Sequence, residues 1–361
     1  MRVPSFTPFC PLTDTPPFAQ RLLSWWDEHG RHDLPWQHPR TPFRVWVSEI
    51  MLQQTQVTTV IPYFERFVQQ LPDLEALARA PLDDVLALWS GLGYYARARN
   101  LHKAARICLE QHQGELPDNA ETLSALPGIG QSTANAIISQ AHDLPATVLD
   151  GNVRRVLARH SAVSGWPGKT TIQRQLWQIA QGHLPARRGA DYTQAIMDLG
   201  ATLCTRSRPG CDRCPVQMDC EAHIADAVER YPAPKPKVNV REHVLFMLIA
   251  ERDNGDILLE RRPAAGIWGG LWCLPSADNR ADLAAQHGLS HEALEMLDEV
   301  EHRLTHRLMR IRPLVARETP ASDKVKCQPD QAWHGRRQWK KLGLPRPVTD
   351  LLERHTRGDD P

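Results

Sequence analysis

Four cysteines lie close together in the middle of this chain, and they constrain its fold more than any other feature. Cys204, Cys211, Cys214 and Cys220 are separated by six, two and five residues. Thiolates at such spacing suit a tetrahedral zinc ion or an iron-sulfur cluster. A zinc site of four cysteines more often has two pairs spaced by two residues, and only one such pair is present. The spacing therefore favours a 4Fe-4S cluster over zinc, in a loop whose role is structural.

A proline-rich connector divides the chain. At 361 residues the chain is longer than one hydrophobic core usually grows, so two domains are expected. Residues 231–237 alternate proline with other residues, which excludes a helix and favours an extended linker. Before it, residues 18–227 read as helices separated by short Pro and Gly breaks. Apolar residues recur at helical spacing in residues 42–71, 82–88 and 101–109. The first domain is therefore predicted to be all α.

The residue pattern changes from helical to strand-like after the connector. Residues 238–250, 257–260 and 308–315 have the β-branched and aliphatic content of strands, with an Asp-Asn-Gly turn at 253–255. Residues 282–288 and 348–355 read as helices. The second domain is therefore predicted to be α+β.

Targeting and charge features are few. No stretch is long and apolar enough to span a bilayer, and residues 1–17 lack the apolar stretch of a signal peptide, so we expect them to form a flexible extension of a cytoplasmic protein.

Cys10, Cys108, Cys273 and Cys327 have no ligand spacing and are expected to be unliganded. The net charge of +1 says little about partners. A basic run that begins at Arg97 is either a phosphate contact or a solvated helix face.

Three further segments contain residues suited to chemistry on a phosphate-bearing substrate. Gly128 and Gly130 predict a tight turn that opens a helix carrying Ser132, and such a turn either cradles a phosphate or is an ordinary helix corner. Asp150 stands where the next helix should begin, so it either only caps that helix or also places a carboxylate in a cleft beside Arg154. Glu49 has apolar neighbours, which would raise its pKa and make it a proton donor, unless it points to water.

Taken together, residues 47–56, 91–100, 148–155 and the cysteine loop resemble the MutY-type adenine DNA glycosylases of the helix-hairpin-helix superfamily, and the likeness extends over residues 18–352. The resemblance implies an all-α helix-hairpin-helix glycosylase domain with a 4Fe-4S loop, followed by an α+β Nudix-like (MutT-like) domain. The implied division is a catalytic domain at 18–230, the linker at 231–237 and an 8-oxoguanine recognition domain at 238–361. Within the catalytic domain it implies a six-helix lobe at about 35–145 and an iron-sulfur lobe at about 18–34 and 146–230.

The same resemblance implies the activity, which is removal of adenine mispaired with 8-oxoguanine or guanine in duplex DNA by a bacterial, nucleoid-associated monomer. Glu49 matches the acid that protonates adenine N7, Asp150 matches the carboxylate that stabilises an oxocarbenium-like sugar, and Asn152 matches the residue that orients water and carboxylate. The adenine pocket would comprise Trp36, Gln37, Leu52, Gln194 and Met197. Residues that probe the duplex would be Gln54, Leu92 and Tyr94, and Gly128, Gly130, Ser132 and Arg154 would contact the DNA.

Two other functions are compatible with parts of this pattern. Endonuclease III has the same hairpin, aspartate and cysteine spacing, but its strand-cleaving lysine is replaced here by Ser132, which cannot form a Schiff base. A monofunctional enzyme is therefore expected. A non-catalytic protein that binds damaged DNA would need the cysteines and the basic residues, but not Glu49 and Asp150.

The C-terminal domain resembles the MutT-like module at residues 261–263 and 266–275. A Nudix hydrolase needs a helix with several glutamates to bind magnesium, and residues 276–287 contain no glutamate. The domain is therefore expected to recognise and not to hydrolyse. Residues 302–307 align with the family loop that contacts 8-oxoguanine, where Thr305 and His306 are the expected contacts and Leu304 replaces the usual aromatic residue.

Overall fold

The computed structural model describes residues 17–236, 241–304, 307–316 and 327–357. The chain forms two compact units. The first comprises Met1–Val45 and Gln131–Lys235, and the second comprises Trp46–Gly130 and Pro236–Pro361.

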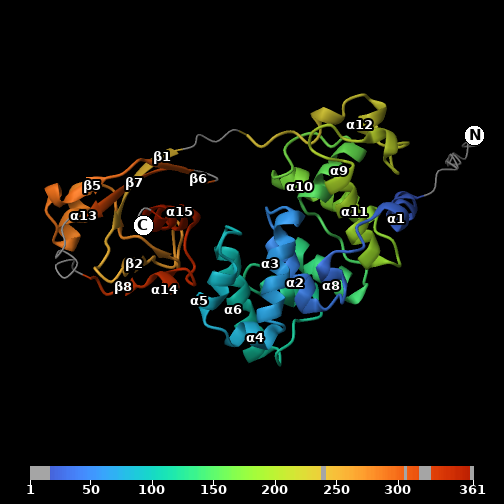
Figure 1. Cartoon of the computed structure of the whole chain (residues 1–361). Helices are drawn as coiled ribbons and strands as arrows, with labels where there is room; N and C mark the ends of the chain where they lie inside the picture. The colour runs from blue at the N-terminus through green and yellow to red at the C-terminus, as the bar shows by residue number, and fades with distance from the viewer. Residues whose placement is uncertain (1–16, 237–240, 305–306, 317–326, 358–361) are drawn as a thin grey trace, which may run out of the picture. The chain divides into compact units, whose positions relative to one another are not determined.

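The first unit is helical and is organised around one central helix, α11 (Figure 1). Helix α11 packs against α1, α8 and α9. Its apolar residues, such as Leu199, share a core with Leu22, Trp26 and Leu157. Full burial of such a side chain stabilises the fold by about 1.5–3 kcal/mol. The elements of this unit are α1 (Phe18–His29), α8 (Gln131–His142), α9 (Gly151–His160), α10 (Thr170–Gly182), α11 (Gly189–Thr202) and α12 (Glu221–Ile224), with short 3-10 turns at Pro35–Gln37, Cys211–Arg213 and Val228–Arg230.

The second unit begins with helices as well. Residues 42–71 are helical as predicted, but they form two helices, α2 and α3, separated by a turn in which Gln54 adopts φ 59°. The helix predicted at 82–88 is α5, and the one predicted at 101–109 is the central part of α6. The bounds are α2 (Pro42–Leu52), α3 (Val57–Gln70), α4 (Leu74–Arg79), α5 (Leu82–Leu88), α6 (Ala96–Gln111) and α7 (Ala120–Ala125).

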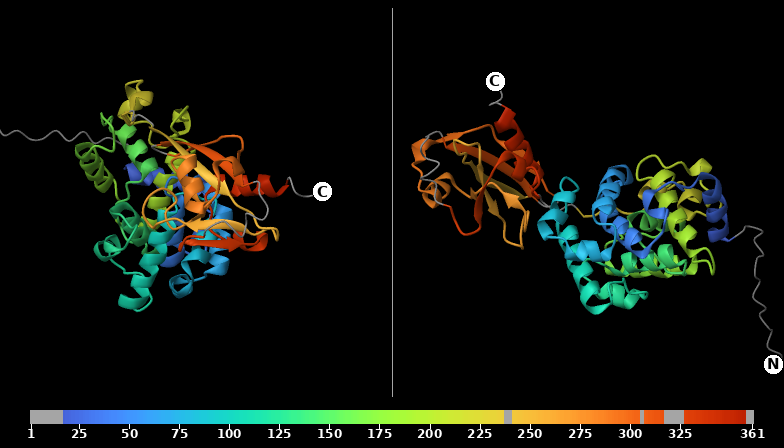
Figure 2. Two further views of the ribbon diagram at one scale, coloured as in Figure 1. Left: turned by 90° about the vertical axis from the view of Figure 1, so that its left-hand side faces the viewer. Right: turned by 60° about the horizontal axis from the view of Figure 1, so that its bottom comes forward.

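The C-terminal part of this unit contains two sheets (Figure 2). In the larger sheet the strand order is β4-β1-β7-β5, β1 and β7 run parallel, and β6 also pairs with β7. The smaller sheet has the order β3-β2-β8. The strands are β1 (Arg241–Ile249), β2 (Ile257–Arg261), β3 (Trp272–Cys273), β4 (Ser276–Ala277), β5 (Leu294–Met296), β6 (Val300–Arg303), β7 (Arg307–Ala316) and β8 (Gln331–His334), and the helices are α13 (Arg280–His287), α14 (Arg336–Trp339) and α15 (Arg346–Arg357).

Alternate residues of strand β1 face two different cores. Met247 and Ile249 pack with α15 residues such as Leu351, whereas Leu248 packs with Leu283 of α13. This alternation is the period of two that a strand buried on both faces requires. The prediction of an all-α domain followed by an α+β domain is confirmed. Within the described ranges, none of the helices combines the length and the apolar character needed to cross a membrane.

Candidate active site and cysteine pocket

Asp150 is the N-cap of helix α9, as predicted. Its backbone is extended and its Oδ1 accepts a hydrogen bond from the Val153 N–H at 2.7 Å. Burial raises the pKa of the Asp150 carboxyl, and this rise is opposed by the N–H groups of Val153 and Asn152 and by the nearby charges of Arg155 and Arg154. The carboxyl is therefore held in a fixed orientation. Burial shifts its pKa in one direction, and the hydrogen bonds and arginine charges shift it in the other.

Helix α8 holds the segment that leads to Asp150. The Ser132 Oγ accepts a hydrogen bond from the Leu149 N–H at 3.0 Å. Three residues further along α8, Asn135 Nδ2 donates to the Thr147 carbonyl at 2.6 Å. Because Leu149 directly precedes Asp150, Ser132 helps to place the carboxylate.

The first turn of α9 is tied to the end of α11. Arg155 Nη2 donates to Asn152 Oδ1 at 2.8 Å and to the Gly200 carbonyl at 2.6 Å. Its Nε donates to the carbonyl of Cys204 at 2.7 Å. A Cβ atom on Gly200 would lie 2.6 Å from Asn152 Cβ, so only glycine allows this approach. Sequence reasoning missed Arg155 and Gly200 as supports of Asn152.

Arg154 also contributes to the start of α9. Its Nε donates to the Leu149 carbonyl at 3.1 Å, and the side chain is half-buried. The Nε–H edge of its guanidinium therefore helps to hold the segment before Asp150.

A buried carboxylate, Asp198, organises the predicted adenine-pocket residues of this unit. It is 0% exposed and accepts hydrogen bonds from Trp26 Nε1 at 3.0 Å and from Gln194 Nε2 at 2.7 Å. Arg31 donates three more, from its backbone N and Nε at 2.8 Å and from Nη2 at 2.6 Å. Since a carboxylate only accepts, this contact fixes the Gln194 amide with its NH2 group toward Asp198. Sequence reasoning missed Asp198, although its spacing of four residues from Gln194 places both on one helix face.

Two buried amides among the predicted pocket residues have polar atoms without a hydrogen-bond partner in the described part of the chain. These atoms are the Gln194 Oε1, an acceptor, and the Gln37 Nε2, a donor. Buried polar groups are normally paired, so both atoms suit a polar ligand. The remaining pocket candidates in this unit are Trp36, which is buried in the turn Pro35–Gln37, and Met197, which is partly buried against the core.

Replacing Asp198 with asparagine is expected to destabilise the fold by about 1.5–3 kcal/mol, which is what hydrogen bonds to a charged group contribute. The asparagine NH2 would face donors, with which it cannot form hydrogen bonds. Urea unfolding followed by circular dichroism would measure the change. The matched control is Asp27→Asn, which removes an exposed ion pair with Arg188 and should cost less than about 1 kcal/mol. Equal losses in the two variants would contradict a special role for Asp198.

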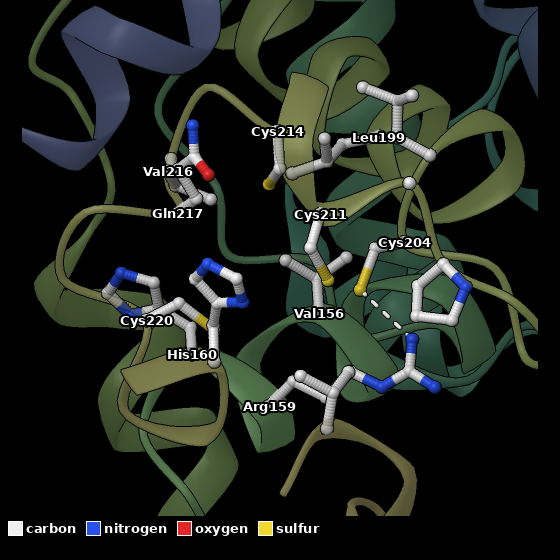
Figure 3. Close-up of a pocket in the computed structure, with 15 residues that line it drawn as sticks. Val156, Arg159, His160, Leu199, Cys204, Cys211, Cys214, Val216, Gln217 and Cys220 are labelled. Atoms are coloured by element: carbon white, nitrogen blue, oxygen red, sulfur yellow. Dashed lines mark hydrogen bonds between the residues drawn. The ribbon is translucent and has the colours of Figure 1, made fainter. Parts of the chain in front are cut away.

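The four clustered cysteines line one cavity (Figure 3). Their sulfur atoms surround a common space that Val156 and Leu199 also line, and Arg159 Nη1 lies 3.3 Å from the Cys204 Sγ. Among the described residues, no three His, Cys, Asp or Glu side chains meet in the arrangement of a single-ion site.

The chemistry of this pocket fits a positively charged group bound by thiolates. Burial raises the pKa of the Cys214 thiol to about 12 and also raises the pKa of Cys211 and Cys220. Thiolates are therefore unfavourable here unless bound iron replaces the protons, as metal binding to cysteines requires. Four thiols around one largely apolar space, with Arg159 beside them, match the donor set of a 4Fe-4S cluster. Cys108 and Cys273 are buried elsewhere, Cys327 is exposed, and Cys10 lies outside the described residues.

Five predicted site residues of the second unit lie on α2, in the turn that follows it and on the loop before α6. Glu49 is partly buried on α2, where Trp46 and Ile50 are fully buried neighbours. Leu52 is partly buried at the end of the same helix. Gln54 and Tyr94 are exposed, and Tyr94 retains 49% of its surface with φ 50°. Leu92, in contrast, is buried.

The glycine turn before α8 has the predicted geometry. Gly128 adopts φ 81°, and a Cβ atom there would lie 2.8 Å from the Cβ of Asn100. Glycine is therefore required at this position. Gly130 has open space where its Cβ would stand, and α8 begins at Gln131.

In the C-terminal domain, Thr305 and His306 lie outside the described residues. Leu304 packs partly buried against the core of the domain. On α13 the first-turn acid is Asp282, whose carboxylate accepts a hydrogen bond from Asn279 Nδ2 at 2.6 Å. This acid therefore serves the start of its own helix.

Comparison with known proteins identifies both domains. Residues 47–181 match the HhH-GPD superfamily of base excision DNA repair proteins, and residues 245–354 match the NUDIX domain. The chain is 36% identical over 339 residues to the adenine DNA glycosylase of Buchnera aphidicola from Acyrthosiphon pisum, covering 93% of this chain and 97% of that protein. It is 38% identical over 345 residues to the adenine DNA glycosylase of Rattus norvegicus, covering 81% and 66%.

Solved structures share the fold of the helical part. A thermostable thymine-DNA glycosylase matches with a TM-score of 0.53 and 26% identity, over 58% of this chain and 95% of that one. A trapped endonuclease III–DNA covalent intermediate matches with a TM-score of 0.50 and 20% identity, over 58% and 94%. The structural matches show the fold, and the adenine DNA glycosylase relatives and the repair-protein family model show that the chain belongs to the adenine DNA glycosylase family and is a DNA N-glycosylase of base excision repair.

Proposed function

We propose that this protein is a monofunctional adenine DNA glycosylase that excises adenine paired with 8-oxoguanine or guanine. The observation that carries this proposal is the Asp150 carboxyl, which the N-terminal turn of α9 holds in place beside Arg154 and Arg155. A fixed carboxylate at that position can stabilise positive charge on a deoxyribose.

Glu49 supplies the other half of the chemistry. Adenine is a poor leaving group unless it is protonated, so Glu49 donates a proton to N7 while the bond between C1′ and N9 breaks. The bonding electrons leave with the base, Asp150 stabilises the oxocarbenium-like sugar, and water guided by Asn152 attacks C1′. The target base must leave the helical stack before this reaction can occur.

The unpartnered amide atoms support adenine as the flipped base. Gln194 Oε1 can accept from the N6 amino group, and Gln37 Nε2 can donate to a ring nitrogen. Trp36, Leu52 and Met197 would complete the pocket.

The remaining assignments belong to the same proposal. Cys204, Cys211, Cys214 and Cys220 would hold a 4Fe-4S cluster, which gives the cysteine loop its structure. The exposed Arg206, Arg208 and Arg213 of that loop would contact phosphates, together with the turn at Gly128 and Gly130.

The proposed domain boundaries are those inferred from the sequence. We propose the catalytic domain at residues 18–230, the linker at 231–237 and an 8-oxoguanine recognition domain at 238–361, whose contacts would include Thr305 and His306. The enzyme would act as a monomer on cytoplasmic, nucleoid-associated DNA.

The test is incubation of the full-length protein with a duplex containing an A:8-oxoguanine pair, followed by alkali to cleave abasic sites. We expect strand cleavage only after alkali, and a loss of about a hundredfold or more in the Glu49→Gln variant, since general acid catalysis contributes that much. Absence of product with the wild type would favour a non-catalytic damage-binding protein. Cleavage before alkali would favour an endonuclease III-like lyase, and full activity in Glu49→Gln would overturn the acid assignment.

A further inference from the structure

Arg97 is a buried arginine whose guanidinium binds six neutral oxygen atoms. It lies in the first turn of α6 and is only 9% exposed. This burial corrects the possibility that Arg97 contacts phosphate as part of an exposed basic run. Nη1 donates to the carbonyls of Ile50 at 2.9 Å, Met51 at 2.8 Å and Gln53 at 2.7 Å, and Nη2 donates to Leu92 O at 3.2 Å, Gly93 O at 3.1 Å and Thr55 Oγ1 at 3.3 Å.

These acceptors belong to two separate segments. Ile50, Met51 and Gln53 supply carbonyls at the C-terminal end of α2, where helical carbonyls have no partner within the helix. A cation is favourable at that end of a helix. Leu92 and Gly93 belong to the loop before α6. One guanidinium therefore joins the end of the helix that carries Glu49 to the loop that carries Tyr94.

Each segment contains an exposed residue in a strained backbone conformation. Gln54 has φ 59° and Tyr94 has φ 50°, in the left-handed region that residues other than glycine rarely adopt. Such conformations are energetically unfavourable and persist only when surrounding contacts impose them. Arg97 binds the carbonyl immediately before each, those of Gln53 and Gly93. Its guanidinium carbon also lies 5.4 Å from the centroid of the Tyr94 ring.

We propose that Arg97 is a positioning residue that holds Gln54 and Tyr94 together as one preformed probe of the mispaired duplex. This inference rests on the proposed function, together with the duplex-probing role that the family resemblance implies for Gln54 and Tyr94. Preorganisation matters here because a probe that is already ordered loses little conformational entropy when it enters the base stack. Lysine cannot replace Arg97, since an ammonium is a single point of charge, whereas the planar guanidinium reaches both segments at once.

The experiment compares full-length wild type with Arg97→Lys on duplexes that carry 2-aminopurine beside the 8-oxoguanine. The adenosine opposite carries a 2′-fluorine, which prevents cleavage, so that binding alone is observed. We expect wild type to unstack the 2-aminopurine and raise its fluorescence. In Arg97→Lys most of this rise should be lost, and the ratio of affinities for mispaired and fully paired duplexes should fall about tenfold, which corresponds to about 1.4 kcal/mol.

The control is Arg79→Lys, the same substitution at an exposed arginine on α4 that pairs with Glu75 at 2.8 Å. It should keep both the fluorescence rise and the affinity ratio. If Arg97→Lys does not fold, Thr55→Val removes one of the six acceptors without changing side-chain shape and should shift both readouts in the same direction by a smaller amount.

Two results would overturn the proposal. One is an unchanged fluorescence rise and affinity ratio in folded Arg97→Lys and in Thr55→Val. The other is equal weakening for both duplexes with the full fluorescence rise per bound molecule, which would mean that Arg97 only stabilises the fold. Neither readout requires excision. If wild type failed to remove adenine but the Arg97 effect remained, the proposed activity would be wrong and the positioning role would stand.

Discussion

Asp150→Asn should slow adenine excision by about a thousandfold, the loss expected when a preorganised electrostatic partner of the transition state is removed. The fold should survive, because asparagine caps a helix as well as aspartate does and can still accept from the Val153 N–H. Single-turnover excision from an A:8-oxoguanine duplex would measure the rate. The substitution would therefore separate the charge of Asp150 from its capping role.

The matched control is Asp73→Asn, at another N-cap aspartate, which accepts from the Ala76 N–H of α4 at 2.8 Å. Its excision rate should equal that of the wild type.

The pH profile provides a second readout of the Asp150 carboxyl. Because burial raises the pKa of Asp150 and the ionised form is the active one, activity should be lost as pH falls through a value above the ordinary 3.8. Full activity in Asp150→Asn would remove this residue from the mechanism.

If the four cysteines hold the proposed 4Fe-4S cluster, Cys211→Ser should prevent its assembly and so disrupt the cysteine loop. A bound metal group contributes folding free energy, on the order of 10 kcal/mol for structural metal sites. We expect the visible absorption of the cluster to disappear, the yield of folded protein to drop, and the DNA affinity of what remains to fall at least about tenfold. Iron content, circular dichroism and a binding titration with uncleavable duplex would measure these effects.

Cys327→Ser is the matched control, because Cys327 is exposed and does not line the cysteine cavity. It should keep the cluster, fold and affinity of the wild type. The opposite pattern for Cys211→Ser, intact fold and affinity with excision alone abolished, would mean that the cluster takes part in the chemistry and not in positioning DNA.

The sequence predicted the elements whose causes are local. Asp150 was recognisable as an N-cap because a cap bonds to an amide three residues away, and the turn at Gly128 was recognisable because a left-handed backbone selects glycine. The change from helices to strands after the proline-rich linker is also indicated by the spacing of apolar residues within short segments, and the structure confirms it. The break between α2 and α3 was missed, because Gln53, Gln54 and Thr55 carry no strong breaking signal and a distant arginine stabilises their turn.

By itself, then, the sequence determined the two domain types, the cysteine loop and the family, because periodicity and motif spacing depend only on residues that are close together in the chain. Only the tertiary structure revealed the residues that support the site. Asp198 joins Trp26, 172 positions away, and Arg97 joins Ile50, 47 positions away, through hydrogen bonds that no local pattern encodes. The physical reason is that a buried charge needs partners from whichever segments the fold brings to it. Arg97 thus changed from a candidate phosphate contact to an internal support when the structure placed carbonyl oxygens around it.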